Sequence, residues 1–531
     1  MLLVLSFLGT LLFQNVLSVD PLVYTNVGLI RGVLANDGDY AMFMGIPYAT
    51  VNKENPFGNS IPFPSFNETF EAYDDTAICP QIYVYNGTIL GTLDCLHLNI
   101  YVPSSASSVN RLPVMVWVHG GSFTRGFSGR YLYGPRFLVE HDVIIVTLNY
   151  RVDAYGFMCL DIPEVPGNQG LKDQFLAFQW IRDNIEAFGG DVDKITLFGQ
   201  SAGGHSIDLH LISNKEKLYN NIILHSGSAV ATTVLHETPK FAHLDMARYL
   251  GFETNDTYEA LSFLAKSDTN LVIEARRDLN IIYKPCVEKE FDGVESFISS
   301  QWINSRVPKV KDTPVLLGYT EHEMAQFHDY DNADSFLNLD IVSRYLMQTF
   351  NFDDEELTEM KTVVEHFYFG DEGTNINMTK DIIAFDSDYT YIHPIHRRID
   401  NYLKSDAGDI FLYMFSYLSS RNDIPNYASH SDDLRYLFDN ARVTQTPTIR
   451  DQQLRDQMTT MWTNFAKYGD PTPETSELLP VKWLPLTTDE YRYLHIDTEV
   501  KLRSRPLHER MTFWNLFYKL NEKSQRGYED I

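Results

Sequence analysis

A glycine–any–serine–any–glycine motif at residues 199–203 (GQSAG) constrains this chain more than any other feature. The apolar run 195–198 (ITLF) precedes the motif, and a stretch that can form a helix follows it. Strand, sharp turn and helix in this order place a serine at the tip of a strained turn with its hydroxyl exposed. The two glycines leave room where chain segments pass too close for a β-carbon. The sequence therefore predicts that Ser201 is a nucleophile held at the end of a strand.

A glycine turn lies upstream of this serine. Residues 114–118 (VMVWV) form an apolar run that leads into 119–123 (HGGSF). A carbonyl attacked by a serine becomes an oxyanion, which needs backbone N–H donors aimed at one place, and a strand followed by such a turn supplies them. We assign the N–H groups of Gly121, Ser122 and Ala202 as the oxyanion hole. Ser122 stands where many such turns have a third glycine, so its side chain is expected to narrow the pocket.

A serine hydroxyl also needs a general base, and the base needs an acid that orients it. His430 lies in a polar loop, 427–434 (YASHSDDL), and is the candidate base. The acid is expected after the buried strand 314–318 (PVLLG), where Glu321 and Glu323 both follow. The spacing from the end of the strand favours Glu323, and Glu321 stays the alternative.

These motifs together resemble the type-B carboxylesterase family, which includes carboxylesterases, cholinesterases and juvenile hormone esterases. The similarity extends over nearly all of residues 19–531. The stretches that carry it are 149–151 (NYR), 156–157 (GF), 167–174 (GNQGLKDQ), 180–191, 199–203, 318–323, 430–433 (HSDD) and 462–471. The resemblance implies an α/β-hydrolase fold, in which helices flank a large, mostly parallel central sheet within a single catalytic domain, residues 19–531.

The resemblance also implies a disulfide between Cys79 and Cys95, which matches the first disulfide of the family. The chain has four cysteines. Cys159 and Cys286 either pair with each other or remain buried thiols in apolar surroundings.

Differences from the family narrow the expected function. The loop 80–94 contains two tyrosines but no tryptophan, whereas cholinesterases place a tryptophan there to bind quaternary ammonium, so a cation–π site is weakened. Gln200 stands where general carboxylesterases often have glutamate. A glutamine at this position resembles juvenile hormone esterases and some insect antennal and integument esterases. Gly204 and Met324 depart from many hormone esterases. Because the chain keeps all three catalytic positions, it is unlike the adhesion members of the family.

The expected function is a serine carboxylic-ester hydrolase that acts through an acyl-enzyme on a small apolar ester. The alternatives are a juvenile hormone esterase, an odorant- or pheromone-degrading esterase, a lipase, and a non-catalytic binding or adhesion glycoprotein. The mechanism implies no metal and no organic cofactor. Aromatic side chains near the site, such as Phe123, are expected to form a wall of an apolar pocket.

The first 18 residues (MLLVLSFLGTLLFQNVLS) predict a signal peptide that is cleaved before Val19, with a buried N-terminal helix as the alternative. No other apolar run is long enough to cross a bilayer. The expected product is a secreted, soluble glycoprotein. Its predicted N-glycosylation acceptors are Asn67, Asn86, Asn255 and Asn377.

The net charge of the 531-residue chain, −28, argues against nucleic acid and anionic membranes as partners. The expected partner is a small-molecule ester.

Overall fold

The structure is a computed structural model, and it describes residues 21–299, 306–328, 340–372, 378–419 and 427–526. The predicted signal peptide, residues 1–18, and the acceptor Asn377 lie outside the described residues. The acceptors Asn67, Asn86 and Asn255 are exposed.

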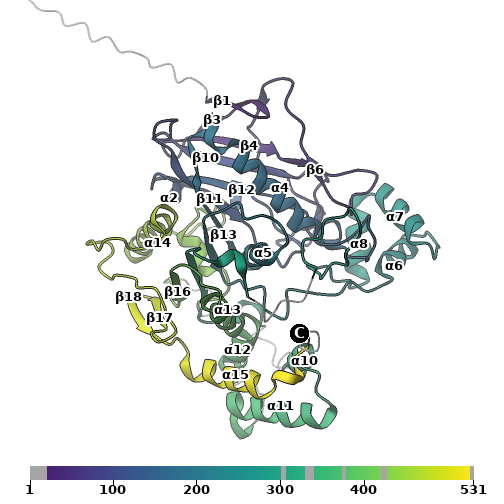
Figure 1. Ribbon diagram of the computed structural model, residues 1–531, viewed down its shortest axis with the longest axis vertical. Coiled ribbons are helices and arrows are strands. Elements are labelled where there is room, and N and C mark those ends of the chain that lie inside the picture. The colour runs from purple at the N-terminus through teal and green to yellow at the C-terminus, as the bar shows by residue number, and fades with distance from the viewer. Residues whose placement is uncertain (1–20, 300–305, 329–339, 373–377, 420–426, 527–531) are drawn as a thin grey trace, which may run out of the picture.

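An eleven-stranded sheet forms the centre of the molecule (Figure 1). The strands between β12 and β17 pair in parallel, whereas antiparallel pairs lie at both edges of the sheet. In sheet order the strands are β18 (Val500–Ser504), β17 (Arg492–Ile496), β16 (Ile410–Phe415), β15 (Val315–Thr320), β14 (Asn221–His225), β13 (Gly190–Gln200), β11 (Leu112–Val118), β12 (Ile144–Leu148), β10 (His97–Pro103), β4 (Tyr40–Pro47) and β3 (Val33–Leu34). This arrangement confirms the predicted fold class.

Short strands lie outside the central sheet. They are β1 (Leu22–Thr25), β2 (Gly28–Arg31), β5 (Ala49–Thr50), β6 (Ile61–Pro62), β7 (Phe70–Glu71), β8 (Gln81–Ile82) and β9 (Ile89–Leu90). They pair as the small sheet β1–β2–β7 and as the hairpins β5–β6 and β8–β9.

Both faces of the central sheet are buried, and strand β11 shows why its sequence is apolar throughout. Val114 and Val116 pack into the apolar cluster on one face of the sheet. Met115 and Trp117 pack into the cluster on the opposite face. Successive side chains of a strand point to opposite faces, so a strand covered on both sides reads as a continuous apolar run.

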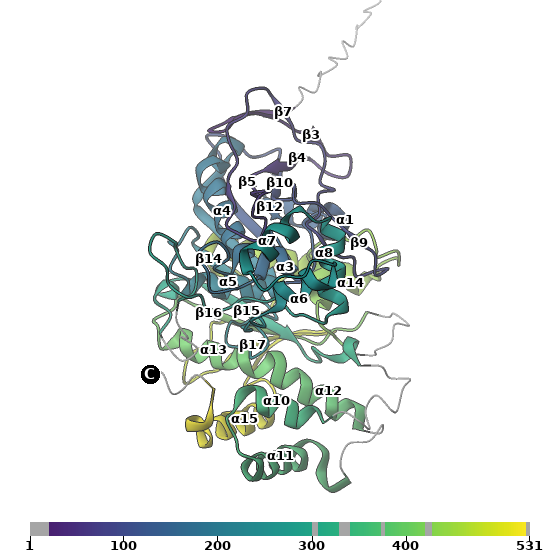
Figure 2. The same cartoon turned by 90° about the vertical axis from the view of Figure 1, so that its right-hand side faces the viewer.

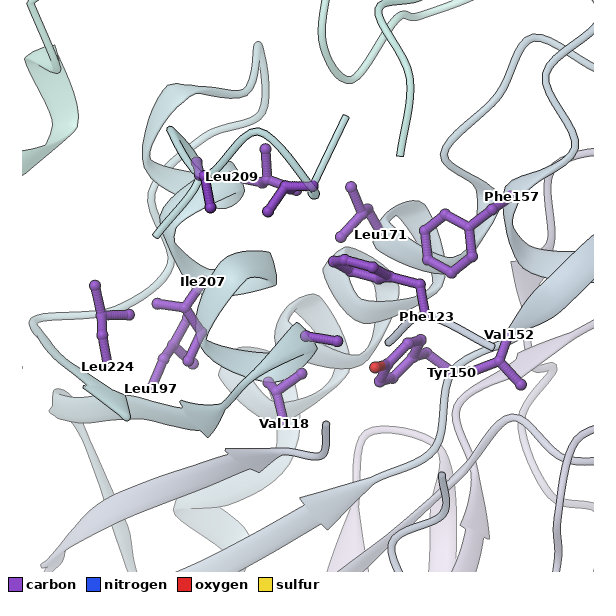
Figure 3. Close-up of a cluster of buried hydrophobic side chains, with 14 of the residues drawn as sticks. Val118, Phe123, Tyr150, Val152, Phe157, Leu171, Leu197, Ile207, Leu209 and Leu224 are labelled. Atoms are coloured by element: carbon purple, nitrogen blue, oxygen red, sulfur yellow. The ribbon is translucent and has the colours of Figure 1, made fainter. Parts of the chain in front are cut away.

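Helices cover the two faces. Helices α4 and α5 contribute to the first cluster, part of which Figure 3 shows, and α2 and α14 contribute to the second. Another group, α10 to α13 with α15, gathers at the end of the molecule beyond β15 and β17 (Figure 2). The helices are α1 (Arg130–Tyr133), α2 (Arg136–Val139), α3 (Asp153–Phe157), α4 (Gln169–Asn184), α5 (Ala202–Ile212), α6 (Ala242–Tyr249), α7 (Thr257–Lys266), α8 (Thr269–Asp278), α10 (Ile341–Thr349), α11 (Asp354–Phe369), α12 (Thr379–Ser387), α13 (His393–Leu403), α14 (Ile449–Tyr468) and α15 (His508–Leu520). None of the helices in the described part of the chain has the length and apolar character needed to traverse a bilayer.

Two disulfides cross-link the chain, one across a short loop and one across a long segment. Cys79 and Cys95 are bonded, as the resemblance implied. Cys159 and Cys286 are also bonded across a sequence separation of 127 residues, which decides the question that the sequence left open.

A buried ion pair links two of the stretches that resemble the family. Arg151 donates to both carboxylate oxygens of Asp173, from Nε at 2.7 Å and from Nη2 at 2.8 Å. Both side chains are fully buried. The remaining Nη1 donates to the carbonyl oxygens of Pro56 and Gly58. Arg151 thus connects the end of β12 to helix α4 and to the loop after β5.

We expect Asp173→Asn to lower the free energy of unfolding by about 3–5 kcal/mol, because it leaves the buried guanidinium of Arg151 without its counter-charge. Urea denaturation followed by tryptophan fluorescence measures the change. Glu71→Gln is the matched control, because Glu71 pairs with Arg31 at a much more exposed site on the surface. Exposed pairs contribute about 1 kcal/mol or less. Equal losses in the two variants would contradict the expectation.

Candidate active site

Ser201 occupies the sharp turn between β13 and α5. Its φ of 54° and ψ of −124° are unusual for a residue with a side chain, and such strain is typical of functional sites. Hydrogen bonds fix the turn on both sides: Ser201 N–H donates to the carbonyl of His225 (2.9 Å), and His205 N–H donates to the carbonyl of Ser201 (2.8 Å).

Close packing explains why the second glycine of the motif, Gly203, cannot be a larger residue. A β-carbon added to Gly203 would lie 1.9 Å from the carbonyl oxygen of Val118 at the end of β11. No side chain fits there without moving the neighbouring strand. The elbow is therefore packed directly against the strand that leads into the glycine turn, as the motif predicts.

His430 and Glu323 meet through a short contact of 2.5 Å between His430 Nδ1 and Glu323 Oε2. Glu323 is fully buried, and its other oxygen accepts hydrogen bonds from the hydroxyl of Ser226 (2.6 Å) and from the N–H of Thr320 (2.8 Å). Glu321, the alternative acid, is partly exposed, and its N–H donates to the carbonyl of Phe415. The contact with the imidazole therefore comes from the residue that the strand spacing favoured.

The other ring nitrogen of His430 faces the elbow. Its Nε2 lies 3.0 Å from Nε2 of Gln200. An amide nitrogen is only a donor, so the ring accepts at Nε2 and donates from Nδ1 to Glu323. His430 thus carries the tautomer that a general base needs, with its lone pair held by the neighbour of Ser201. The sequence singled out Gln200 only by comparison with the family, and the structure gives it this contact.

Tyr391 is a site residue that the sequence did not indicate. Its ring lies over the imidazole of His430, with centroids 4.7 Å apart. Burial raises the pKa of Tyr391 well above its ordinary value, and a hydrogen bond with the Ser201 side chain offsets part of that rise. Tyr391 sits in a π-helical turn, Asp388–Ile392, between α12 and α13. Such turns often occur at functional sites, but no pattern in the sequence marks this one.

The glycine turn lies against the elbow. A β-carbon on Gly120 would lie 3.1 Å from Cβ of Ser201. Three consecutive residues, Gly121, Ser122 and Phe123, have positive φ, which turns their backbone sharply. Among the described residues, no hydrogen bond engages the N–H groups of Gly121, Ser122 or Ala202, the three groups assigned to the oxyanion hole. The side chain of Ser122 is exposed.

Two side chains near the turn have structural roles. His119 stacks on Tyr150 with centroids 4.4 Å apart, and burial lowers its pKa to about 4, so it stays neutral at physiological pH. Phe123 was expected in the pocket wall, but it is buried and packs edge-on against Phe157 (Figure 3). Its ring therefore belongs to the core below the turn.

The loop that carries His430 is anchored from below. Asp433, three residues further along, accepts from the hydroxyl of Tyr413 (2.7 Å) and contacts Nδ1 of the buried His225 (2.8 Å). His225 in turn accepts at Nε2 from the indole of Trp462 (3.0 Å). The carbonyl of the same His225 holds Ser201 in place, so this network connects the histidine loop to the nucleophile turn.

Comparisons with known proteins show which proteins the chain is similar to. A model of the carboxylesterase family matches residues 19–514. The chain is 31% identical over 551 aligned residues to bile salt-activated lipase of Rattus norvegicus, covering 94% of this chain and 86% of the relative. It is 28% identical to juvenile hormone esterase of Tribolium castaneum, covering 85% and 84%. The crystal structure of juvenile hormone esterase from Manduca sexta with OTFP covalently attached superposes with a TM-score of 0.81 at 26% identity, covering 94% of this chain and 100% of that one.

Proposed function

The chain belongs to the carboxylesterase family, and from this premise we propose that it is a secreted hydrolase of small esters that works through an acyl-enzyme on Ser201. His430 is the general base and Glu323 the acid that orients it. The observation that carries the proposal is the chain of contacts from Glu323 through His430 to the strained turn at Ser201.

The catalytic cycle follows from these positions. Ser201 Oγ attacks the ester carbonyl while Nε2 of His430 takes its proton, once the amide of Gln200 has given up that nitrogen. The carboxylate of Glu323 orients the ring and stabilises the imidazolium. The N–H groups of the glycine turn and of Ala202 stabilise the oxyanion. The alcohol leaves with the proton from His430, and water repeats the sequence to release the acid.

A fluorophosphonate probe tests the activated serine. We expect the native enzyme to incorporate one phosphonyl group per chain, located on Ser201 by peptide mass spectrometry, because only a serine beside a general base reacts quickly. Heat-denatured protein is the control and should remain unlabelled. Labelling spread over several serines, or no labelling at all, would contradict an activated Ser201. That result would favour the alternative, a non-catalytic binding or adhesion protein.

Secretion is part of the proposal. The apolar leader of residues 1–18, the exposed acceptors Asn67, Asn86 and Asn255 and the two disulfides support it, because disulfides persist in oxidising compartments.

Hydrolysis of juvenile hormone is the second candidate, favoured by the structural match to the Manduca sexta enzyme. A panel with a terpenoid methyl ester, a pheromone-type acetate, an aryl acetate and an emulsified long-chain ester distinguishes the candidates. A kcat/KM for the methyl ester at least about a hundredfold above the others would favour the hormone, and a preference for the emulsion would favour a lipase.

A further inference from the structure

A cavity of about 370 Å³ adjoins the candidate active site. Gly120, Gln200 and His430 line it on the side of the reacting atoms. Tyrosines from the segment between the first two cysteines, Tyr83 and Tyr85, line it further out. Its volume lies within the range typical of small-molecule sites.

The charge of this cavity is opposite to that of the whole protein. Arg125, Arg435 and Arg442 line it, and none of the described residues that line it is an Asp or a Glu, although Asp432 pairs with Arg435 from just outside the wall. The chain as a whole has 71 acidic residues against 43 basic ones, so chance alone would favour carboxylates in such a wall. Gln200, whose side chain is a neutral amide, lies in the same wall.

The guanidinium groups retain hydrogen-bonding capacity. In the described part of the chain, neither Arg125 nor Arg442 forms a salt bridge, and Arg442 lies over the ring of Tyr85 at 3.5 Å from its centroid. Arg435 is different, because it donates from Nη2 to Asp432 at 2.6 Å and its Nη1 is buried, so the donors available to a ligand are those of Arg125 and Arg442. Donors of this kind fit the oxygens of carboxylate, sulfate or phosphate groups.

We propose that this cavity holds the alcohol part of an ester that carries an anionic group on that part. The inference rests on the proposed function, because His430 must pass its proton to the leaving oxygen and the leaving group therefore lies on the side of the imidazole. The tyrosine rings contact the apolar body of the alcohol, and the arginines bind its anionic end. The substrate class is thus an amphiphilic ester with a negatively charged alcohol part.

Three acetate esters of similar shape test the proposal: neutral phenyl acetate, anionic 4-acetoxybenzoate and cationic 4-acetoxyphenyl-trimethylammonium. The readout is the ratio of kcat/KM for the anionic ester to that for the neutral ester. Comparing this ratio between enzyme variants removes the intrinsic reactivity of each ester. We expect Arg442→Gln and Arg125→Gln each to lower the ratio about fivefold to tenfold, as the loss of one partly screened charge predicts.

Two controls separate charge from packing. Arg442→Lys keeps the charge and should retain most of the ratio, whereas Arg248→Gln removes an equal charge from the exposed helix α6, away from the cavity, and should change the ratio less than about twofold. About 0.5 M sodium chloride should lower the ratio of the native enzyme, because salt screens the charges.

The outcomes of these experiments are distinguishable. An unchanged ratio in both cavity variants, or a native preference for the cationic ester, would overturn the anionic pocket while turnover still depends on Ser201. Turnover of phenyl acetate that survives Ser201→Ala would instead overturn the proposed function.

Discussion

Replacing Ser201 with alanine is expected to lower kcat/KM for a soluble aryl ester by about four to six orders of magnitude. The variant keeps the oxyanion donors and the binding cavity but has no atom that can form the acyl-enzyme. Alanine fits the elbow without a clash, because the strained φ of 54° already accommodates a β-carbon. Initial rates with phenyl acetate, combined with thermal unfolding to show that the fold is intact, measure the loss.

Ser122→Ala is the matched control for that variant. It also removes a serine hydroxyl from the site, but the proposed oxyanion donation comes from the backbone N–H and survives the change. We expect its kcat/KM to stay within about threefold of the native value. More than about 1% residual activity in Ser201→Ala, from protein shown to be free of native enzyme, would refute the assignment of the nucleophile.

The second large effect is expected at the acid. Glu323→Gln should lower kcat by about three to four orders of magnitude, because a neutral amide neither fixes the tautomer of His430 nor stabilises its protonated form. The amide introduced by this substitution would also have to satisfy the two donors, Ser226 and Thr320, that now point at Oε1. Single-turnover kinetics place the loss in the chemical step.

Glu321→Gln is the matched control, since it removes the same charge from the same turn. Its carboxylate makes no contact with His430 that the structure records, so we expect less than about a threefold change in kcat. A larger loss in Glu321→Gln than in Glu323→Gln would reverse the assignment of the acid.

The local parts of this site were predictable from the sequence, because each depends on a short segment. The elbow at Ser201 follows from its two glycines and the strand before it. The choice between Glu321 and Glu323 was harder, because both lie in one turn: the spacing from the strand only favoured Glu323, and the contact with His430 distinguishes the two. That position depends on the long-range network through Asp433 and His225, which no local pattern reveals.

The remaining features depend on contacts between segments far apart in sequence. Tyr391 reaches the imidazole from a π-helical turn, and Arg442 reaches the cavity from a loop after the histidine. The pairing of Cys159 with Cys286 depends on how the segment between them folds back. The ion pair of Arg151 with Asp173 likewise joins two stretches. Each could be identified from the sequence on its own, but the contact between them could not.

The disulfide between Cys159 and Cys286 makes a covalent ring of the segment that contains β13, the elbow at Ser201 and β14. Helices α6, α7 and α8 lie in the same ring, and a protease can reach the chain at the loop between α6 and α7, where Gly251 and Glu253 are exposed. A single nick there opens the polypeptide but releases no fragment, because both pieces stay joined through sulfur. The nicked molecule runs as one band in a non-reducing gel and as two bands after reduction. Cleavage in this region is therefore detected only when the disulfide is reduced.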